Sequence, residues 1–115
     1  MMISKNHKKL VEILNEIGLM VETEVQVEPY SLDCYEYDCH IGFEADSKVT
    51  HMKGRDRKRD NFIMQKYNIP ILRIYDTEMK NKEEVTQKIL GFIEHWYESA
   101  EVRRGGFMPR TKGVL

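Results

Sequence analysis

Three carboxylates stand in a stretch that otherwise has the composition of β-strands. Residues 32–46 read LDCYEYDCHIGFEAD, and they place Asp33, Glu44 and Asp46 where strands are expected. Acidic side chains are disfavoured in strands and are costly to bury unless an ion pair or a metal ion compensates them. Glu44 and Asp46 are two residues apart and share a face of their strand, and adjacent strands lie about 4.8 Å apart. The spacing predicts that the three carboxylates converge on one point.

Converging carboxylates repel one another unless a cation lies among them. Oxygen ligands of this kind select Mg²⁺, Mn²⁺ or Ca²⁺. We therefore interpret Asp33, Glu44 and Asp46 as a metal site. The alternative is that they face solvent or pair with nearby Lys and Arg side chains, since ion-pair networks also gather carboxylates.

A basic segment directly follows the acidic cluster. Residues 48–59, KVTHMKGRDRKR, contain six Lys or Arg residues and one His. Runs of charge usually form a solvated loop or helix face. Beside buried carboxylates, however, this segment is suited to binding phosphates. The candidate phosphate-binding residues are Lys48, Arg55, Arg57 and Arg59.

Length and composition predict one soluble domain. The chain has 115 residues, of which 41% are hydrophobic and 32% are charged, and its net charge is −1. This charge gives no global basic field, so composition alone does not predict a nucleic-acid partner. No apolar run approaches the roughly 20 residues of a membrane span, and the N-terminus lacks the apolar core of a signal peptide. We expect a cytoplasmic protein without membrane contact.

The two cysteines do not form a recognisable metal or disulfide motif. Cys34 and Cys39 are five residues apart in a strand region, and the neighbouring His40 brings no fourth zinc ligand at normal spacing. We expect both cysteines to be reduced and structural.

Hydrophobic periodicity predicts the element order αβββαβα. Helices are expected over 4–17, 54–67 and 81–100, and strands over 19–27, 32–37, 40–46 and 69–76. In the first strand, alternation puts Val21, Thr23, Val25 and Val27 on one face and Glu22, Glu24 and Gln26 on the other. The second and third strands can pair as a hairpin, whereas the fourth follows a helix and is expected to lie parallel to a neighbour.

The domain is expected to occupy residues 1–100. Residues 101–115 have no period and contain two adjacent glycines. We expect them to form a flexible basic C-terminal tail.

The ordered set of motifs resembles the PD-(D/E)XK, or restriction-endonuclease-like, nuclease superfamily, and within it the branch of very-short-patch-repair-like endonucleases. The matching residues are Asp33, Glu44, Asp46, His51, the run Arg55 to Asp60, and Ile71-Leu72-Arg73. The resemblance implies an α/β fold, a restriction-endonuclease-like αβββαβα core with a mixed sheet flanked by helices. It also implies an endonuclease that hydrolyses phosphodiester bonds in DNA with Mg²⁺, for which Mn²⁺ is expected to substitute.

The resemblance further implies roles for individual residues. Asp33 and Glu44 would bind the metal together with the Ala45 carbonyl, and Asp46 would complete the acidic shell or orient the attacking water. His51 would donate to phosphate or shuttle a proton.

Gln26 and Arg73 are auxiliary candidates in the same comparison. The chain departs from the superfamily pattern at Asp46, where a lysine is common, and at His7, where the first helix is expected to carry an acid.

Two alternatives stay open at this point. One is a Holliday-junction-resolvase-like enzyme on branched DNA, which would need a homodimer to cut two strands. The other is a catalytically inactive nucleic-acid-binding relative. Specificity for a DNA sequence would have to come from loops, the tail, a partner or a dimer mate.

Overall fold

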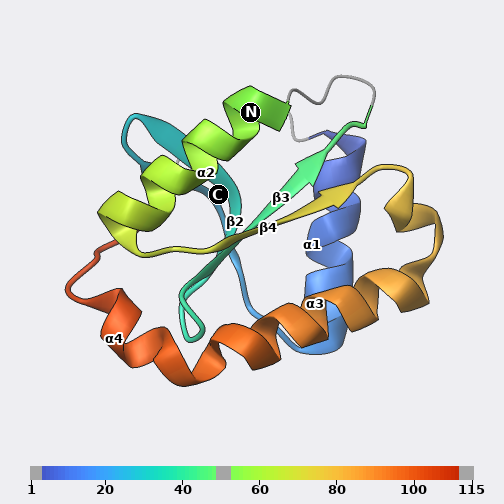
Figure 1. Cartoon of the computed structure of the whole chain (residues 1–115). Helices are drawn as coiled ribbons and strands as arrows, with labels where there is room; N and C mark the ends of the chain where they lie inside the picture. Colours follow the sequence, from blue (N-terminus) through green and yellow to red (C-terminus); the bar gives the residue numbers. More distant parts are fainter. Residues whose placement is uncertain (1–3, 49–52, 112–115) are drawn as a thin grey trace.

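A five-stranded mixed sheet lies at the centre of the computed structural model, which describes residues 4–48 and 53–111 (Figure 1). The elements are α1 (Lys5–Ile17), β1 (Glu22–Val27), β2 (Tyr30–Glu36), β3 (Ile41–Asp46), α2 (Lys53–Tyr67), β4 (Ile71–Tyr75), η1 (Glu78–Lys80), α3 (Lys82–Trp96), η2 (Tyr97–Ser99), α4 (Ala100–Arg104) and β5 (Arg110–Thr111). The strand order is β4-β3-β2-β1-β5, with β3 and β4 parallel and the other pairs antiparallel. The predicted αβββαβα core with a mixed sheet is confirmed.

Helix α1 is defined by its two ends. At its start the Ser4 side chain accepts a hydrogen bond of 3.1 Å from the His7 backbone N–H, which caps the first turn. At its end Gly18 adopts a left-handed conformation with φ 105°, and the Leu19 N–H bonds to the Leu14 carbonyl at 3.0 Å. Leu19 therefore belongs to the C-terminal cap of α1, and β1 begins at Glu22 rather than at the predicted residue 19.

The helices cover the two faces of the sheet unequally. Helices α1 and α3 bury their apolar stripes on one face, where the buried residues include Leu10, Leu14, Phe43, Ile74 and Ile89. Helix α2 covers the other face and contributes Ile63 to a second core with Val25, Val27, Leu32, Tyr35 and Ile69. Figure 1 shows α2 across the sheet from α1 and α3. Polar side chains of the strands are accessible at the edge of the sheet, between the layer formed by α1 and α3 and the layer formed by α2.

The alternation predicted for β1 fails at Glu24. This residue has φ 52°, which is unusual for a side chain other than glycine. As a result Val21 packs against the core under α1, whereas Val25 and Val27 pack against the core under α2. A left-handed residue inside a strand reverses the faces on either side of it, and the apolar pattern cannot reveal this.

Two regular elements lie at or beyond residue 100, in the region where the sequence predicted the end of the domain and a tail. Residues 100–104 form α4, and Arg110 and Thr111 pair with β1 as strand β5. Arg103 is only 7% exposed, and its guanidinium donates to the carbonyl oxygens of His40 at 2.5 Å, Cys39 at 2.6 Å and Trp96 at 2.8 Å. Hydrophobic periodicity did not predict these contacts of the C-terminal segment, because they are made by a buried arginine and not by an apolar stripe.

In the described part of the chain, none of the helices combines the length and the apolar character needed to cross a bilayer.

The docking of α4 makes a prediction about stability. Arg103→Met keeps most of the side-chain length but leaves the carbonyls of Cys39 and His40 without the guanidinium donor, so it should lower the free energy of unfolding by about 2–3 kcal/mol. Urea denaturation followed by circular dichroism measures this difference. Val102→Ala, on the same short helix at an 85% exposed position, is the matched control and should change little. Equal stability of the two variants would contradict a structural role for Arg103.

Candidate active site

The sheet forks between β2 and β3. In the described residues these strands pair from Glu36 and Ile41 up to Cys34 and Phe43. Beyond that point β2 continues with β1, while β3 continues with β4 as far as the pair of Asp46 with Tyr75. Asp33 and Glu44 lie at the fork, where the backbone ladder between the two strands ends.

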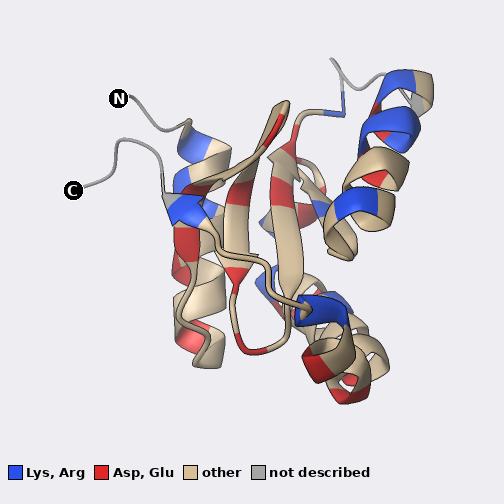
Figure 2. Cartoon of the chain, turned by 90° about the vertical axis from the view of Figure 1, so that its left-hand side faces the viewer, with Lys and Arg blue, Asp and Glu red and all other residues tan. Residues whose placement is uncertain are grey.

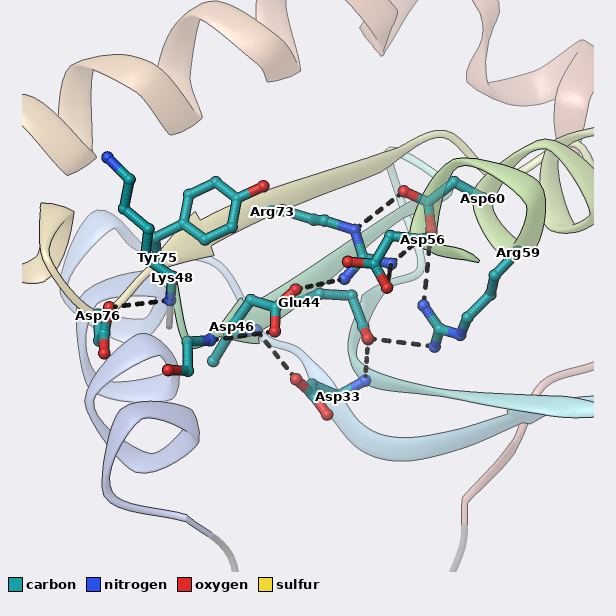
Figure 3. A network of polar contacts seen from close by, with 12 residues as sticks. Asp33, Glu44, Asp46, Lys48, Asp56, Arg59, Asp60, Arg73, Tyr75 and Asp76 are labelled. Carbon is teal, nitrogen blue, oxygen red and sulfur yellow. Dashed lines mark hydrogen bonds and ion pairs between the residues drawn. The ribbon is translucent and has the colours of Figure 1, made fainter. Parts of the chain in front are cut away.

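Two reciprocal hydrogen bonds replace the backbone ladder at the fork. The Asp33 N–H donates to Glu44 Oε2 at 2.6 Å, and the Ala45 N–H donates to Asp33 Oδ2 at 2.9 Å (Figure 3). Each carboxylate thus satisfies an amide of the opposite strand, which fixes its position. The predicted proximity of Asp33 and Glu44 is present in the structure.

Burial gives Glu44 an unusual protonation equilibrium. The residue is 7% exposed, and burial, together with the charge of Asp33, raises its pKa to about 7. Arg59 opposes this shift, since its Nη2 lies 3.1 Å from Glu44 Oε1. The Arg59 side chain also bonds to the Ser31 carbonyl, so it spans from β2 to Glu44. Glu44 therefore requires a positive partner, and in the structure Arg59 supplies it.

Asp46 does not converge with the other two carboxylates. Its Oδ2 accepts a hydrogen bond of 2.8 Å from Arg73 Nη1, and its Oδ1 accepts from the Ser47 N–H at 3.0 Å. Arg73 also binds Asp60 through Nε at 3.0 Å and through Nη2 at 2.7 Å. Burial by itself would lower the pKa of Arg73, but Asp60 and the other nearby carboxylates raise it. For Asp46 the ion-pair alternative describes the geometry, and the prediction of three converging carboxylates is wrong in this respect.

A cleft of about 670 Å³ opens between the fork and α2. Its lining comes from β2, β3, β4 and α2 and consists of Tyr30, Ser31, Asp33, Glu44, Asp46, Arg55, Asp56, Lys58, Arg59 and Arg73. Figure 2 shows acidic residues on the strands and a series of Lys and Arg residues along α2. The cleft thus has carboxylates on its floor and cations on one wall.

The remaining predicted residues lie around the cleft or away from it. Arg55 is exposed and lines it, and Arg57 is exposed on the same helix without lining it. Lys48 is exposed, and in Figure 3 its ammonium group points away from Glu44 and Asp33. Gln26 is not in the cleft, because it bonds to Glu28 at 2.7 Å and lines a different pocket. His51 lies outside the described residues.

The charged cleft residues Asp56 and Lys58 were not among the predicted site residues. Asp60, which was not predicted either, lies one helical turn from Asp56 on α2, and both aspartates are near Arg73. The i, i+4 spacing of Asp56 and Asp60 in the sequence could have indicated a shared partner.

A different set of side chains is close enough to hold one ion. Within residues 4–48 and 53–111, the ligand atoms of His7, Glu24 and Asp33 all lie within 4.8 Å of one another. The sequence placed Glu24 on a strand face without a role and noted His7 only as a departure from an expected acid. The positive φ of Glu24 gives no signal in the sequence.

The cysteines and His40 do not form a comparable set. Both ring nitrogens of His40 are engaged, since Nδ1 accepts from the Tyr35 hydroxyl at 2.7 Å and Nε2 donates to the Tyr67 carbonyl at 2.9 Å. Burial lowers the pKa of His40, and it raises the pKa values of Cys34 and Cys39, which are buried free thiols. These residues are structural, as expected.

No protein-family model and no curated protein matches the sequence. Among solved structures, the catalytic domain of the homing endonuclease I-Bth0305I is similar, with a TM-score of 0.67 and 20% sequence identity over 81% of this chain and 97% of that domain. The TM-score establishes a shared fold. The chain therefore has a mixed α/β fold that a nuclease catalytic domain also adopts.

The raised pKa of Glu44 makes a prediction about pH. The folded state binds the Glu44 proton more tightly than the unfolded state, in which the carboxyl has its ordinary pKa of 4.5. Protonated Glu44 therefore contributes fully to the free energy of unfolding below about pH 4.5, and this contribution is lost as the pH rises through 7. The loss amounts to at most about 3 kcal/mol. In EDTA, Glu44→Gln should remove this loss and be more stable than the wild type at pH 8. Thermal denaturation between pH 4 and 8 measures the effect.

The control is Glu83→Gln, at an exposed position in the first turn of α3. This variant should follow the wild-type pH profile. If Glu44→Gln also follows it, the Glu44 carboxyl is not destabilised by its surroundings.

Proposed function

We propose that the protein is a metal-dependent DNA endonuclease of the PD-(D/E)XK superfamily, in the branch of very-short-patch-repair-like enzymes. The observation that carries this proposal is the reciprocal bonding of Asp33 and Glu44 across the fork. It holds two carboxylates side by side in a cleft whose other wall is basic. The similarity to a homing endonuclease catalytic domain supports the choice of a nuclease on this fold.

Asp33 and Glu44, with the Ala45 carbonyl, would hold Mg²⁺ or Mn²⁺. The residues fit a hard cation because both offer carboxylate oxygens and because Glu44 is buried beside another negative charge. A bound Mg²⁺ would supply Lewis acidity toward the scissile phosphate and lower the pKa of a coordinated water.

Arg59 is the residue whose role changes on binding. In the structure it neutralises Glu44, so a metal ion and Arg59 compete for the same carboxylate. Once released, its guanidinium lies beside the cleft opening with Arg55 and Lys58 and is suited to bidentate phosphate binding. We infer that Arg59 moves from Glu44 to the DNA backbone.

Asp46 and His51 complete the proposed machinery. Asp46 is held by Arg73, so it would orient the attacking water from a fixed position rather than bind the metal directly. His51 would donate to a phosphate oxygen or carry away the water's proton, since imidazole titrates near neutral pH.

The proposal predicts the outcome of a plasmid-nicking assay. Supercoiled DNA should be cut with Mg²⁺ or Mn²⁺ and not with EDTA, and Asp33→Asn should slow cutting by at least about a hundredfold because it removes a charge that stabilises the reacting complex. The matched control is Asp38→Asn, at an exposed position in the turn after β2, which should cut at the wild-type rate. A protein that binds DNA but does not nick it under any of these conditions would be an inactive relative instead.

The basic wall predicts a salt effect that is independent of DNA sequence. Replacing Arg55 and Arg57 with Gln should weaken binding to all duplexes alike and should reduce the slope of log K against log salt by about one for each phosphate that is no longer neutralised. Fluorescence anisotropy at several salt concentrations measures the slope. Lys9→Gln, exposed on α1 across the sheet from α2, is the control and should leave the slope unchanged. A weakening confined to one DNA sequence would mean that the arginines bind bases.

A further inference from the structure

The cluster of His7, Glu24 and Asp33 lies where the first turn of α1 meets β1 and β2. Its ligand atoms are within 4.8 Å of one another, and His7 is only 4% exposed. We propose that these three side chains bind a divalent transition-metal ion, Mn²⁺ or Zn²⁺, at a site separate from the Asp33 and Glu44 pair and joined to it through Asp33.

The tautomer of His7 is the first argument. Its Nε2 lies 3.0 Å from the Asp33 carbonyl oxygen, which can only accept, so Nε2 carries the proton. In the neutral ring Nδ1 then presents a lone pair, and this atom faces Glu24 Oε1 at 3.6 Å. Two acceptors directed at each other in a largely buried place need either a proton or a metal ion between them.

The hydrogen bond from His7 Nε2 to the Asp33 carbonyl is of the kind found around metal-binding histidines. In such sites one ring nitrogen binds the metal while the other donates to a carbonyl or carboxylate, which fixes the ring and makes it a better ligand. Here the Asp33 carbonyl holds Nε2 and leaves Nδ1 directed at the Glu24 carboxylate. The His7 ring is thus oriented before any ion arrives.

The backbone brings Glu24 and Asp33 to this ring. The pairs of Thr23 with Cys34 and of Val25 with Leu32 place Glu24 opposite Asp33 on adjacent strands. The side chain of Glu24, whose backbone is left-handed, lies toward α1, on the face opposite Val25 and Val27. Such a conformation outside glycine destabilises the fold by about 1 kcal/mol, and it is retained where the surroundings hold it.

The donor set selects the type of ion. One imidazole nitrogen with two carboxylate oxygens suits Mn²⁺ and Zn²⁺, whereas Mg²⁺ prefers oxygen ligands and retains its water. Donor atoms around one such ion lie about 3–3.5 Å apart, given bonds near 2.1 Å. Separations of up to 4.8 Å must therefore shorten by up to about 1.3–1.8 Å, which a rotation of the Glu24 side chain would provide.

The inference concerns binding and does not rest on the proposed nuclease function. Asp33 belongs to both sites, but His7 and Glu24 do not line the cleft beside α2. Glu44, conversely, is not part of the His7 cluster. The two sites can therefore be removed one at a time.

The test is a titration of ¹⁵N-labelled wild-type protein with Mn²⁺, followed through the histidine ring signals. Paramagnetic broadening should remove the His7 signals at the lowest Mn²⁺ concentrations and leave those of His95, which is exposed near the end of α3, as the internal reference. Glu44→Gln should still show the His7 broadening while losing Mg²⁺-dependent nicking. If this variant keeps the broadening and the wild type shows no nicking, the His7 site stands and the nuclease proposal fails.

Variants separate a metal site from a simple ion pair. His7→Gln keeps an amide that can donate to the Asp33 carbonyl but lacks the imidazole ligand, so in the Glu44→Gln background calorimetry should show Mn²⁺ affinity reduced by more than about tenfold. His95→Gln in the same background should leave the affinity unchanged. Equal broadening of His7 and His95, or unchanged affinity in His7→Gln, would mean that His7 pairs with Glu24 only as an imidazolium, and the proposal would be wrong.

Discussion

The exchange of hydrogen bonds between Asp33 and Glu44 is the interaction on which the rest of the site depends. A sheet that separates into two arms leaves backbone amides without partners, and unpaired buried amides are costly. Here the two carboxylates take the place of the missing strand neighbours. The same side chains therefore stabilise the fork and supply its negative charge. A substitution that removes the charge but keeps the acceptor, such as an amide, separates these two roles.

The negative charge is balanced by two arginines that act differently. Arg73 is fixed by Asp60 and Asp46 and forms part of a closed network between β3, β4 and α2. Arg59 binds Glu44 through one ion pair and lies over the Tyr30 ring, with its guanidinium carbon 5.5 Å from the ring centre. Arg59 also bonds to the Ser31 carbonyl and lies 3.6 Å from Asp60 Oδ1, but it makes one ion pair with Glu44, whereas Arg73 makes three hydrogen bonds with Asp46 and Asp60. The proposed release of Arg59 from Glu44 therefore breaks a single ion pair.

The sequence predicted those parts of the structure that depend on short-range spacing. The order of elements, the closeness of Asp33 and Glu44, and the basic character of α2 all follow from periodicity or from residue types in one stretch. The position of Asp46 could not be predicted in this way, because it depends on Arg73, which lies 27 residues further along the chain. The same holds for Arg103, whose acceptors Cys39 and His40 are more than 60 residues away. Glu24 illustrates a third limit, since a single left-handed residue puts Val21 and Val25, which flank it, on different faces without changing the apolar pattern.

The bridge that Arg59 makes from Ser31 to Glu44 has a thermodynamic consequence. In the proposed complex, Glu44 and a DNA phosphate would compete for the charge of one guanidinium. In the proposed complex, a phosphate that draws Arg59 away leaves Glu44 more receptive to a divalent ion, and an ion at Glu44 frees Arg59 for phosphate. Linkage requires that each ligand strengthen the binding of the other by the same factor. A single side chain would then make substrate and cofactor cooperative without any movement of the backbone.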